Sequence, residues 1–205
     1  MAIDTKTRDK WDRAATFFDI SAGLGTEKRW EPFKKALFSH MDGDILFMAA
    51  GTGLDFPCFP PGMTVTAIDI SPKMLEKAKI RAINYQGRID LLEMDVQSLA
   101  FSDGRFDQVF TSCTFCSVPD PVAGLMEIRR VLKPGGMLRM FEHTASGIFP
   151  FNLMLHLMNP ISRIFGPEVT RDTLNNLDRA RFAILKVENH FLDVVRSIHA
   201  KAPEM

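Results

Sequence analysis

This 205-residue sequence predicts an α/β fold, in which a doubly wound, mostly parallel sheet carries helices on both faces. Short apolar runs alternate with segments of helical periodicity through most of the chain, and this alternation favours parallel strands joined by crossovers. The first apolar run, 45–49, leads into a turn that contains Gly51 and Gly53. The second run, 65–69, ends in the carboxylate of Asp69, 18 residues after Gly51. That interval is near the roughly 20 residues expected of a ribose-binding acid in a βαβ site, so we predict a ligand that carries a nucleoside.

Two helices are expected before the first strand. Residues 7–19 have a helical pattern with aromatic side chains on one side, and these rings could cover the ligand or pack in the core. In residues 27–41 apolar side chains again recur at helical spacing, which predicts a second amphipathic helix. The aromatic residues of the first helix are Trp11, Phe17 and Phe18.

The first crossover should be short or irregular, because residues 55–62 contain three prolines. After the second strand, Ser71 and Pro72 supply the N-cap and the first-turn proline of a helix that runs to about Asn84. A third strand is expected at 89–94.

A turn then leads to a fourth strand at 106–111. Residues 121–131 predict a helix with one apolar side, and the Lys-Pro-Gly-Gly sequence at 133–136 should end it sharply. A fifth strand follows at 137–141.

The C-terminal part of the chain combines an apolar stretch with two more strands. Residues 148–166 are rich in Met and Phe and are interrupted by Pro150 and Pro160. Such a density of apolar residues outside the sheet indicates an acceptor pocket, a membrane-touching cap or a buried helix pair. Alternation at 182–188 and 194–201 predicts two final strands, seven in all.

Composition limits the function classes. Lys and Arg together number 25, as do Asp and Glu, so no global field draws the chain to nucleic acid, and we expect no nucleic-acid partner. No signal region and no run of 18–20 apolar residues are present, and we expect a cytoplasmic protein. The length suits one globular unit, in which N-terminal helices at 1–42 cap a domain at 43–205.

Three cysteines are too few for a disulfide framework and favour a reducing compartment. Cys113 and Cys116 form a CxxC pair, which raises the question of a metal or redox site. A zinc site needs a second ligand pair, and none is evident. We therefore expect ordinary thiols and no metal.

Five further segments carry one ordered set of motifs. They are a glycine-rich motif at 49–53, an acidic second motif at 68–75, residues 94–96, the approach to the fourth strand at 101–107, and the helix and turn at 128–136. In this order and spacing the sequence resembles the class I S-adenosylmethionine-dependent methyltransferases, in their menaquinone-biosynthesis-like, type 11 branch. Within that class it is most similar to the alkyl-thiol methyltransferase-like group and to bacterial phosphatidylethanolamine N-methyltransferases.

The resemblance implies a Rossmann-like fold with one antiparallel strand in the last pair, and S-adenosyl-L-methionine as the cofactor. Asp69 should then bind the ribose, Asp95 and Val96 the adenine, and Ser112 and Cys113 should lie near the reactive methyl group. A helix cap is the alternative role for Asp95. The expected cofactor-binding residues are Ala49, Ala50, Gly51, Thr52, Gly53, Asp69, Ile70, Met74, Asp95, Val96, Ser112 and Cys113.

Two residues depart from the family pattern. Phe47 stands where the family usually has an acid, and Ala49 where it usually has a glycine. Both changes leave open a non-catalytic, methyltransferase-like binding protein. A nucleotide-dependent oxidoreductase is a further alternative, although the chain lacks the third glycine of the dinucleotide fingerprint and a Tyr-x-x-x-Lys pair.

The chemistry is expected at the carboxyl end of the fifth strand, where open-sheet sites are built. His143 could deprotonate or orient an acceptor, with Glu142 beside it, or it could be a structural residue bonded to backbone. His156 and His190 fit structural or surface roles. The acceptor should be small and hydrophobic or membrane-associated: a thiol, an amine, a quinol or a phospholipid headgroup. Peripheral membrane contact is a further expectation, whereas the oligomeric state cannot be read.

Overall fold

The computed structural model describes residues 3–23, 26–165 and 167–204; the side chains of 20–27, 164 and 165 are outside this description. Two helices come first, α1 (Thr5–Gly23) and α2 (Thr26–Phe38). The prediction of two N-terminal helices is confirmed, although α1 is longer than expected and α2 ends earlier.

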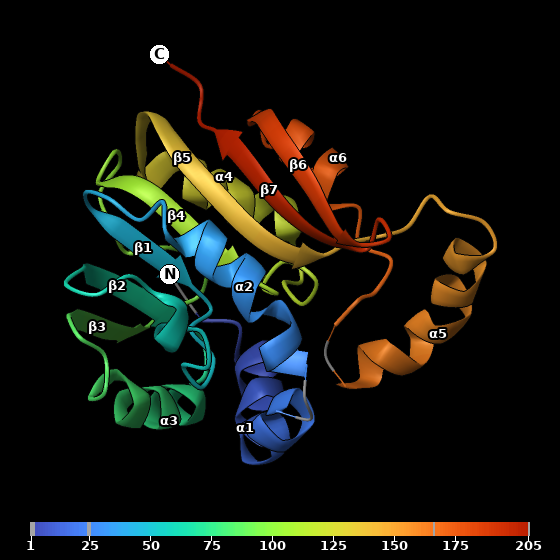
Figure 1. Ribbon diagram of the computed structural model, residues 1–205, viewed down its shortest axis with the longest axis horizontal. Coiled ribbons are helices and arrows are strands. Elements are labelled where there is room, and N and C mark those ends of the chain that lie inside the picture. The colour runs from blue at the N-terminus through green and yellow to red at the C-terminus, as the bar shows by residue number, and fades with distance from the viewer. Residues whose placement is uncertain (1–2, 24–25, 166, 205) are drawn as a thin grey trace.

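The sheet has seven strands in the order β3-β2-β1-β4-β5-β7-β6 (Figure 1). Every neighbouring pair from β3 to β5 is parallel, whereas β7 runs antiparallel to both β5 and β6. The Rossmann-like order and the one antiparallel strand are therefore confirmed. The strands are β1 Ile45–Met48, β2 Thr64–Asp69, β3 Arg88–Glu93, β4 Phe106–Ser112, β5 Leu132–His143, β6 Ala183–Phe191 and β7 Val195–Lys201.

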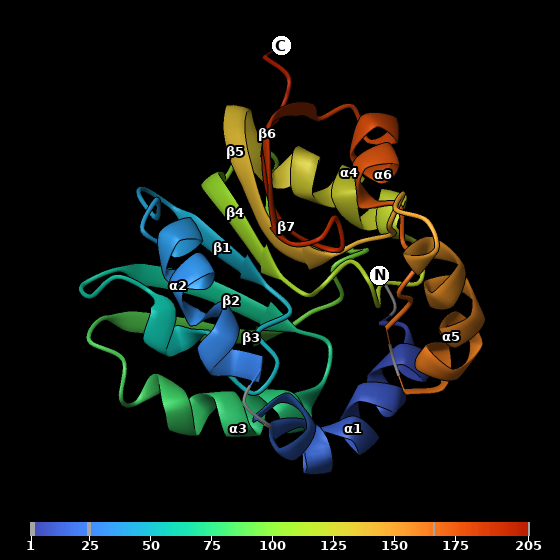
Figure 2. The same cartoon turned by 45° about the vertical axis from the view of Figure 1, so that its right-hand side comes forward.

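Helices cover both faces of the sheet (Figure 2). Alternate residues of β1 point to opposite faces, as the strand period requires. Ile45 and Phe47 pack with α2 and α3 (Pro72–Ala82), and Leu46 and Met48 pack in the cluster that includes α4 (Pro121–Val131) and α6 (Thr173–Arg179). The strand is buried throughout because both faces are covered.

Side-chain caps mark the first turns of α3 and α4. The Ser71 hydroxyl accepts a hydrogen bond from the Met74 amide, and the Asp120 carboxylate accepts one from the Ala123 amide. Each cap is followed by a proline in the first turn. The first crossover contains only a short 3-10 helix, η1 (Phe56–Cys58), as its prolines predicted.

Two expectations were wrong, and one helix was not expected. Residues 133–136 end α4 but are themselves part of β5, because Leu132 already pairs with Phe106 and the ladder resumes at Met137 after a shift in register. Pro160 does not interrupt helix α5 (Phe151–Phe165). The short helix α6 was not foreseen at all; Asp172 caps it by accepting a hydrogen bond from the Asn175 amide.

Candidate functional site

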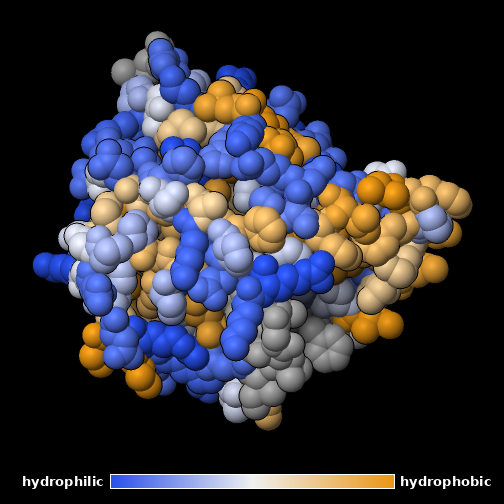
Figure 3. Space-filling model, viewed as in Figure 1, coloured by the Kyte–Doolittle hydropathy of each residue, from blue (hydrophilic) through white to orange (hydrophobic). Residues whose placement is uncertain are grey.

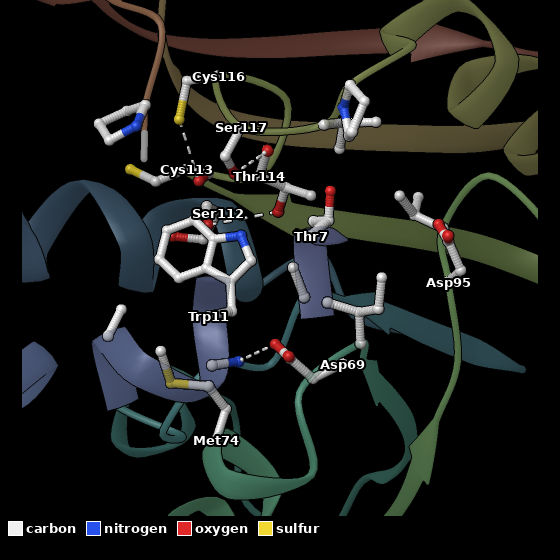
Figure 4. Close-up of a pocket in the computed structure, with 18 of the residues that line it drawn as sticks. Thr7, Trp11, Asp69, Met74, Asp95, Ser112, Cys113, Thr114, Cys116 and Ser117 are labelled. Carbon is white, nitrogen blue, oxygen red and sulfur yellow. Dashed lines mark hydrogen bonds between the residues drawn. The ribbon is translucent and has the colours of Figure 1, made fainter. Parts of the chain in front are cut away.

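A cavity of about 810 Å³ lies at the carboxyl ends of the parallel strands (Figure 4). It is lined by residues that follow β1, β2, β3 and β4, by one side of α1 and by the segment after α5. The order of the sheet changes direction between β1 and β4, and ligands of open α/β sheets bind at such a switch point. Of the predicted residues, the lining includes Ala49, Gly51, Asp69, Ile70, Met74, Asp95, Val96, Ser112, Cys113 and His143.

Asp69 ends β2 at the cavity wall and organises the loops on either side of it. Its carboxylate accepts hydrogen bonds from the backbone N–H of Gly51 and of Ser71, each at 2.8 Å. Burial raises the pKa of Asp69 to about 6, although these hydrogen bonds oppose the shift. Gly51 and Asp69, which are 18 residues apart in the sequence, are therefore in direct contact through this hydrogen bond.

Asp95 lies at the next loop of the same wall. One carboxylate oxygen accepts from the Gln97 amide at 2.9 Å, and the other from the Asp4 amide at 3.3 Å. Asp95 therefore stabilises the turn that contains Gln97. Met74 and Val96 supply apolar surface to the same cavity. A helix cap, the alternative role for Asp95, is not what it forms.

The loop after β4 is held by a buried carboxylate. Cys113 adopts a left-handed conformation, with φ of 51°, and its amide donates to the Phe141 carbonyl at 2.7 Å. Glu142 accepts from the Thr111 hydroxyl at 2.7 Å and from the amides of Thr114 and Phe115 at 3.1 Å each. This carboxylate fixes the direction in which the loop leaves the sheet.

Glu142 itself does not line the cavity. Its side chain is 0 % exposed, and burial raises its pKa to about 7. A direct catalytic contact, expected from the sequence, does not fit this position. His143, one residue later, points the other way and lines the cavity. Burial lowers the pKa of His143, and its Nδ1 has no hydrogen-bond partner among the described residues. The neutral imidazole is thus the form favoured here.

Helix α1 closes one side of the cavity. Trp11 and Phe18 meet edge to face, with ring centroids 6.1 Å apart, and Phe17 lines the cavity beside them. The helix is bonded to the loops around the site. Asp12 accepts from the Ser71 hydroxyl, and Asp19 accepts from the Thr52 hydroxyl at 2.6 Å.

Three predicted residues of the glycine-rich motif do not line the cavity. Ala50 is buried in the core, and the Thr52 hydroxyl is used by Asp19. At Gly53, an added Cβ would lie 2.7 Å from the Phe56 ring, so this glycine serves close packing. Phe47 is also fully buried, between the rings of Phe38 and Phe59, and does not block the cavity.

The three cysteines form no disulfide. Cys113 lines the cavity, and Cys116 donates its thiol to the Cys113 carbonyl at 3.3 Å. Burial raises the pKa of Cys116 far above its ordinary value, which disfavours a reactive thiolate. The part of the chain that the structure describes contains no cluster of three or more metal-ligating side chains.

Some lining residues gave no sequence signal. They come mainly from the loop after Cys113 and from the segment after α5, which have neither periodicity nor a motif. These residues are Thr7, Ala14, Gln97, Thr114, Ser117, Val118, Pro119, Pro167 and Val169. The support that Glu142 gives to the loop after Cys113 is visible only in the structure.

Ala49→Gly is expected to stabilise the protein by about 1 kcal/mol. Ala49 has a φ of 52°, a left-handed conformation that costs a residue with a Cβ about 1–2 kcal/mol. The greater freedom of glycine in the unfolded chain offsets part of that gain. Urea unfolding measures the difference. Ala50→Gly, next to it and without a positive φ, should destabilise; a fall in stability for both variants would contradict the strain at position 49.

Comparison with known proteins agrees with this geometry. Residues 46–140 match the family model described as a methyltransferase domain. Thiol S-methyltransferase TMT1B of Homo sapiens is 33% identical over 180 residues, which cover 80% of this chain and 72% of that protein. The ubiquinone/menaquinone biosynthesis C-methyltransferase UbiE of Geotalea daltonii is 31% identical over 162 residues, covering 74% and 68%.

A solved SAM-dependent methyltransferase from Thermotoga maritima shares the fold. Its TM-score is 0.72 at 17% identity, with 94% of this chain and 99% of that chain covered. The fold, the ordered motifs and these relatives together exclude an oxidoreductase as the best description. The chain belongs to the S-adenosylmethionine-dependent methyltransferase family.

Proposed function

We propose that this methyltransferase transfers the methyl group to a small apolar thiol. The observation that carries the proposal is the largely apolar end of the cavity, where Cys113, Val118 and His143 lie together with the aromatic rings of α1. The Nδ1 atom of His143 has no hydrogen-bond partner among the described residues. The relative named as a thiol S-methyltransferase supports the same acceptor class.

The residues present fit the cofactor. Asp69 lines a cavity large enough for a ligand and an acceptor together, and among the described residues its oxygens accept from the backbone amides of Gly51 and Ser71. It can accept from the two hydroxyls of a ribose. Asp95 would accept from the adenine amine, while Met74 and Val96 contact the ring. When bound, S-adenosylmethionine supplies an electrophilic methyl group on a sulfonium.

His143 then has one task, which is to hold or remove the acceptor proton. A thiol must lose its proton to become a good nucleophile, and a neutral imidazole at the cavity wall can accept it. Burial lowers the pKa of His143 and so keeps it neutral at physiological pH. The aromatic residues of α1 exclude water from the reacting atoms. Glu142 acts indirectly, by positioning the 113–115 backbone.

A methyl-release screen over alkyl thiols, amines, quinols and phospholipids tests the acceptor. Turnover with apolar thiols above the other classes supports the proposal. Preference for a quinol, the class that the name of UbiE suggests, would overturn the thiol as acceptor and leave the methyltransferase assignment unchanged. Thermal shift with S-adenosylhomocysteine and NAD, run side by side, checks the cofactor, because a ligand that binds only the folded state raises Tm.

His143→Ala is expected to lower kcat with a thiol about 100-fold, the lower range for loss of a general base. Binding of S-adenosylhomocysteine, measured by calorimetry, should not change. The loss should shrink with an acceptor whose thiol is already ionised at the assay pH. His40→Ala, an exposed histidine outside the cavity, is the matched control. Full turnover in His143→Ala would remove its role as a base.

A further inference from the structure

Helix α5 presents an apolar surface to solvent rather than to the core. In Figure 3 this surface covers the part of the molecule that projects beyond the sheet. Several large apolar side chains of α5 are exposed, and that of Leu157 is 72% exposed. The exposed apolar residues of α5 and of the turn before it are Ile148, Phe149, Leu153, Met154, Leu157, Met158 and Ile161; we call them the α5 patch. The side chains of Ile164 and Phe165, also part of the predicted apolar stretch, lie outside the described residues.

The helix has two apolar sides and one polar side. Leu155 is buried and faces the protein. At 100° per residue, Leu153 to Met158 of the α5 patch span about 140° of the circumference, away from Leu155. Asn152, His156 and Arg163 fall together on the remaining side. Such a helix packs on the protein with one apolar side and leaves a second apolar side exposed for binding a partner or a surface.

Basic residues lie near one end of the patch, whereas the carboxylate of Asp193 lies at the other end, where it accepts from the Ser146 hydroxyl and the Gly147 amide beside Ile148. Between Glu142 and Glu168 the sequence has no acidic residue, and its only formal charge is Arg163. The Lys10 ammonium donates to the Arg163 carbonyl at 3.1 Å, which places α1 against the end of α5. Burial lowers the pKa of Lys10, and the positive charges of Arg163 and Lys6 lower it further. Three basic residues therefore gather beside the patch.

An apolar arc bordered by cations fits the surface of an anionic bilayer. The 15 residues of α5 extend about 22 Å, less than a bilayer core requires, and no described helix is long and apolar enough to cross one. A two-fold dimer through the same patch is the alternative occupant, and the oligomeric state tests it below. We propose that the α5 patch docks this protein on an anionic membrane surface.

The docking rests on the proposed function in one respect: we infer that the acceptor thiol enters the cavity from the bilayer. Pro167 and Val169, just beyond α5, line the cavity, as does Phe17 of α1, which is 68% exposed. The docking surface therefore borders the cavity. An apolar thiol dissolved in the bilayer would reach His143 without crossing water.

Sedimentation with vesicles tests the docking independently of catalysis. The full chain is mixed with vesicles of phosphatidylcholine alone or with one third phosphatidylglycerol, at low and high salt. We expect binding mainly to the anionic vesicles. The double variant Leu157→Ser with Ile161→Ser should weaken binding at least about tenfold, because two exposed apolar anchors are lost. Lys6→Gln with Arg163→Gln should weaken it about 25-fold on anionic vesicles only, since each basic residue near such a surface contributes a factor of about five.

The matched control is Ile80→Ser with Ile83→Ser, which removes two similarly exposed isoleucines from and beside α3. It should bind vesicles like the unchanged chain. Thermal shift with S-adenosylhomocysteine confirms that each variant is folded. No sedimentation with any vesicle, or equal loss in the control, would overturn the proposal. So would analytical ultracentrifugation that shows a dimer lost in the Leu157→Ser, Ile161→Ser variant. Failure of thiol turnover with vesicle binding intact would overturn the acceptor and not the docking.

Discussion

Asp69→Ala is expected to abolish the thermal shift produced by S-adenosylhomocysteine. The carboxylate is placed to accept two ribose hydroxyls, and a hydrogen bond to a charged group contributes about 1.5–3 kcal/mol. Losing two of them weakens binding by about 3–6 kcal/mol, or roughly 100- to 10,000-fold. The loss also removes the acceptor of the Gly51 and Ser71 amides, so the glycine turn loses its support. Isothermal calorimetry of the purified variant measures the change.

The control for this prediction is Asp90→Ala on the neighbouring strand β3, an acid that pairs with Arg88 at the surface. It should bind S-adenosylhomocysteine normally. Asp69→Asn separates charge from shape, because the amide keeps one oxygen acceptor, and it should bind with intermediate affinity. An unchanged thermal shift in Asp69→Ala would remove Asp69 from the cofactor site.

Glu142→Ala is expected to destabilise the fold by about 3 kcal/mol or more. Three buried donors, the Thr111 hydroxyl and the amides of Thr114 and Phe115, would lose their acceptor. Each unsatisfied buried donor costs about 1–3 kcal/mol. Because the same amides hold the loop that lines the cavity, turnover should fall as well. Denaturant unfolding and steady-state kinetics measure the two effects.

Glu142→Gln tests the charge separately. Its oxygen can still accept from Thr111 and Thr114, but its NH₂ group would face the Phe115 amide, so a smaller loss is expected. Burial raises the pKa of Glu142 to about 7, above its unfolded value, so its protonated form favours folding. That stabilisation is complete below about pH 4.5 and is lost as the pH rises through 7; in Glu142→Gln the dependence should flatten. Equal stability of all three proteins would show that the loop does not depend on this carboxylate.

The sequence predicted most of the sheet because its strands are short, apolar and separated by clear turn residues. Asp69 could be placed because a carboxylate at the end of a buried strand needs a partner, and Gly51 provides one. The same reasoning assigned Glu142 and His143 together to the site. Neighbouring strand residues point to opposite sides, and the structure sends Glu142 inward and His143 to the cavity.

Other features depend on contacts that no local pattern reveals. Residues 133–136 read as a turn, yet pairing with β4 keeps them in the sheet. Pro160 was expected to break a helix, but its fixed φ is compatible with α5, and the helix continues past it. Pairing with a neighbouring strand therefore overrides local preference at 133–136. The lining loop after Cys113 is defined by Glu142, which lies 27 or more positions away in the chain.

Phe47 lies in a packed cluster of aromatic rings. Its ring lies 5.8 Å from that of Phe38 and 5.0 Å from that of Phe59, measured between centroids. An acidic side chain at this position, which the family resemblance led us to expect, would bury a charge among aromatic side chains, at a cost of several kcal/mol. An acid at position 47 would therefore require these rings to be repacked at the same time, and the cavity of this protein is built without it.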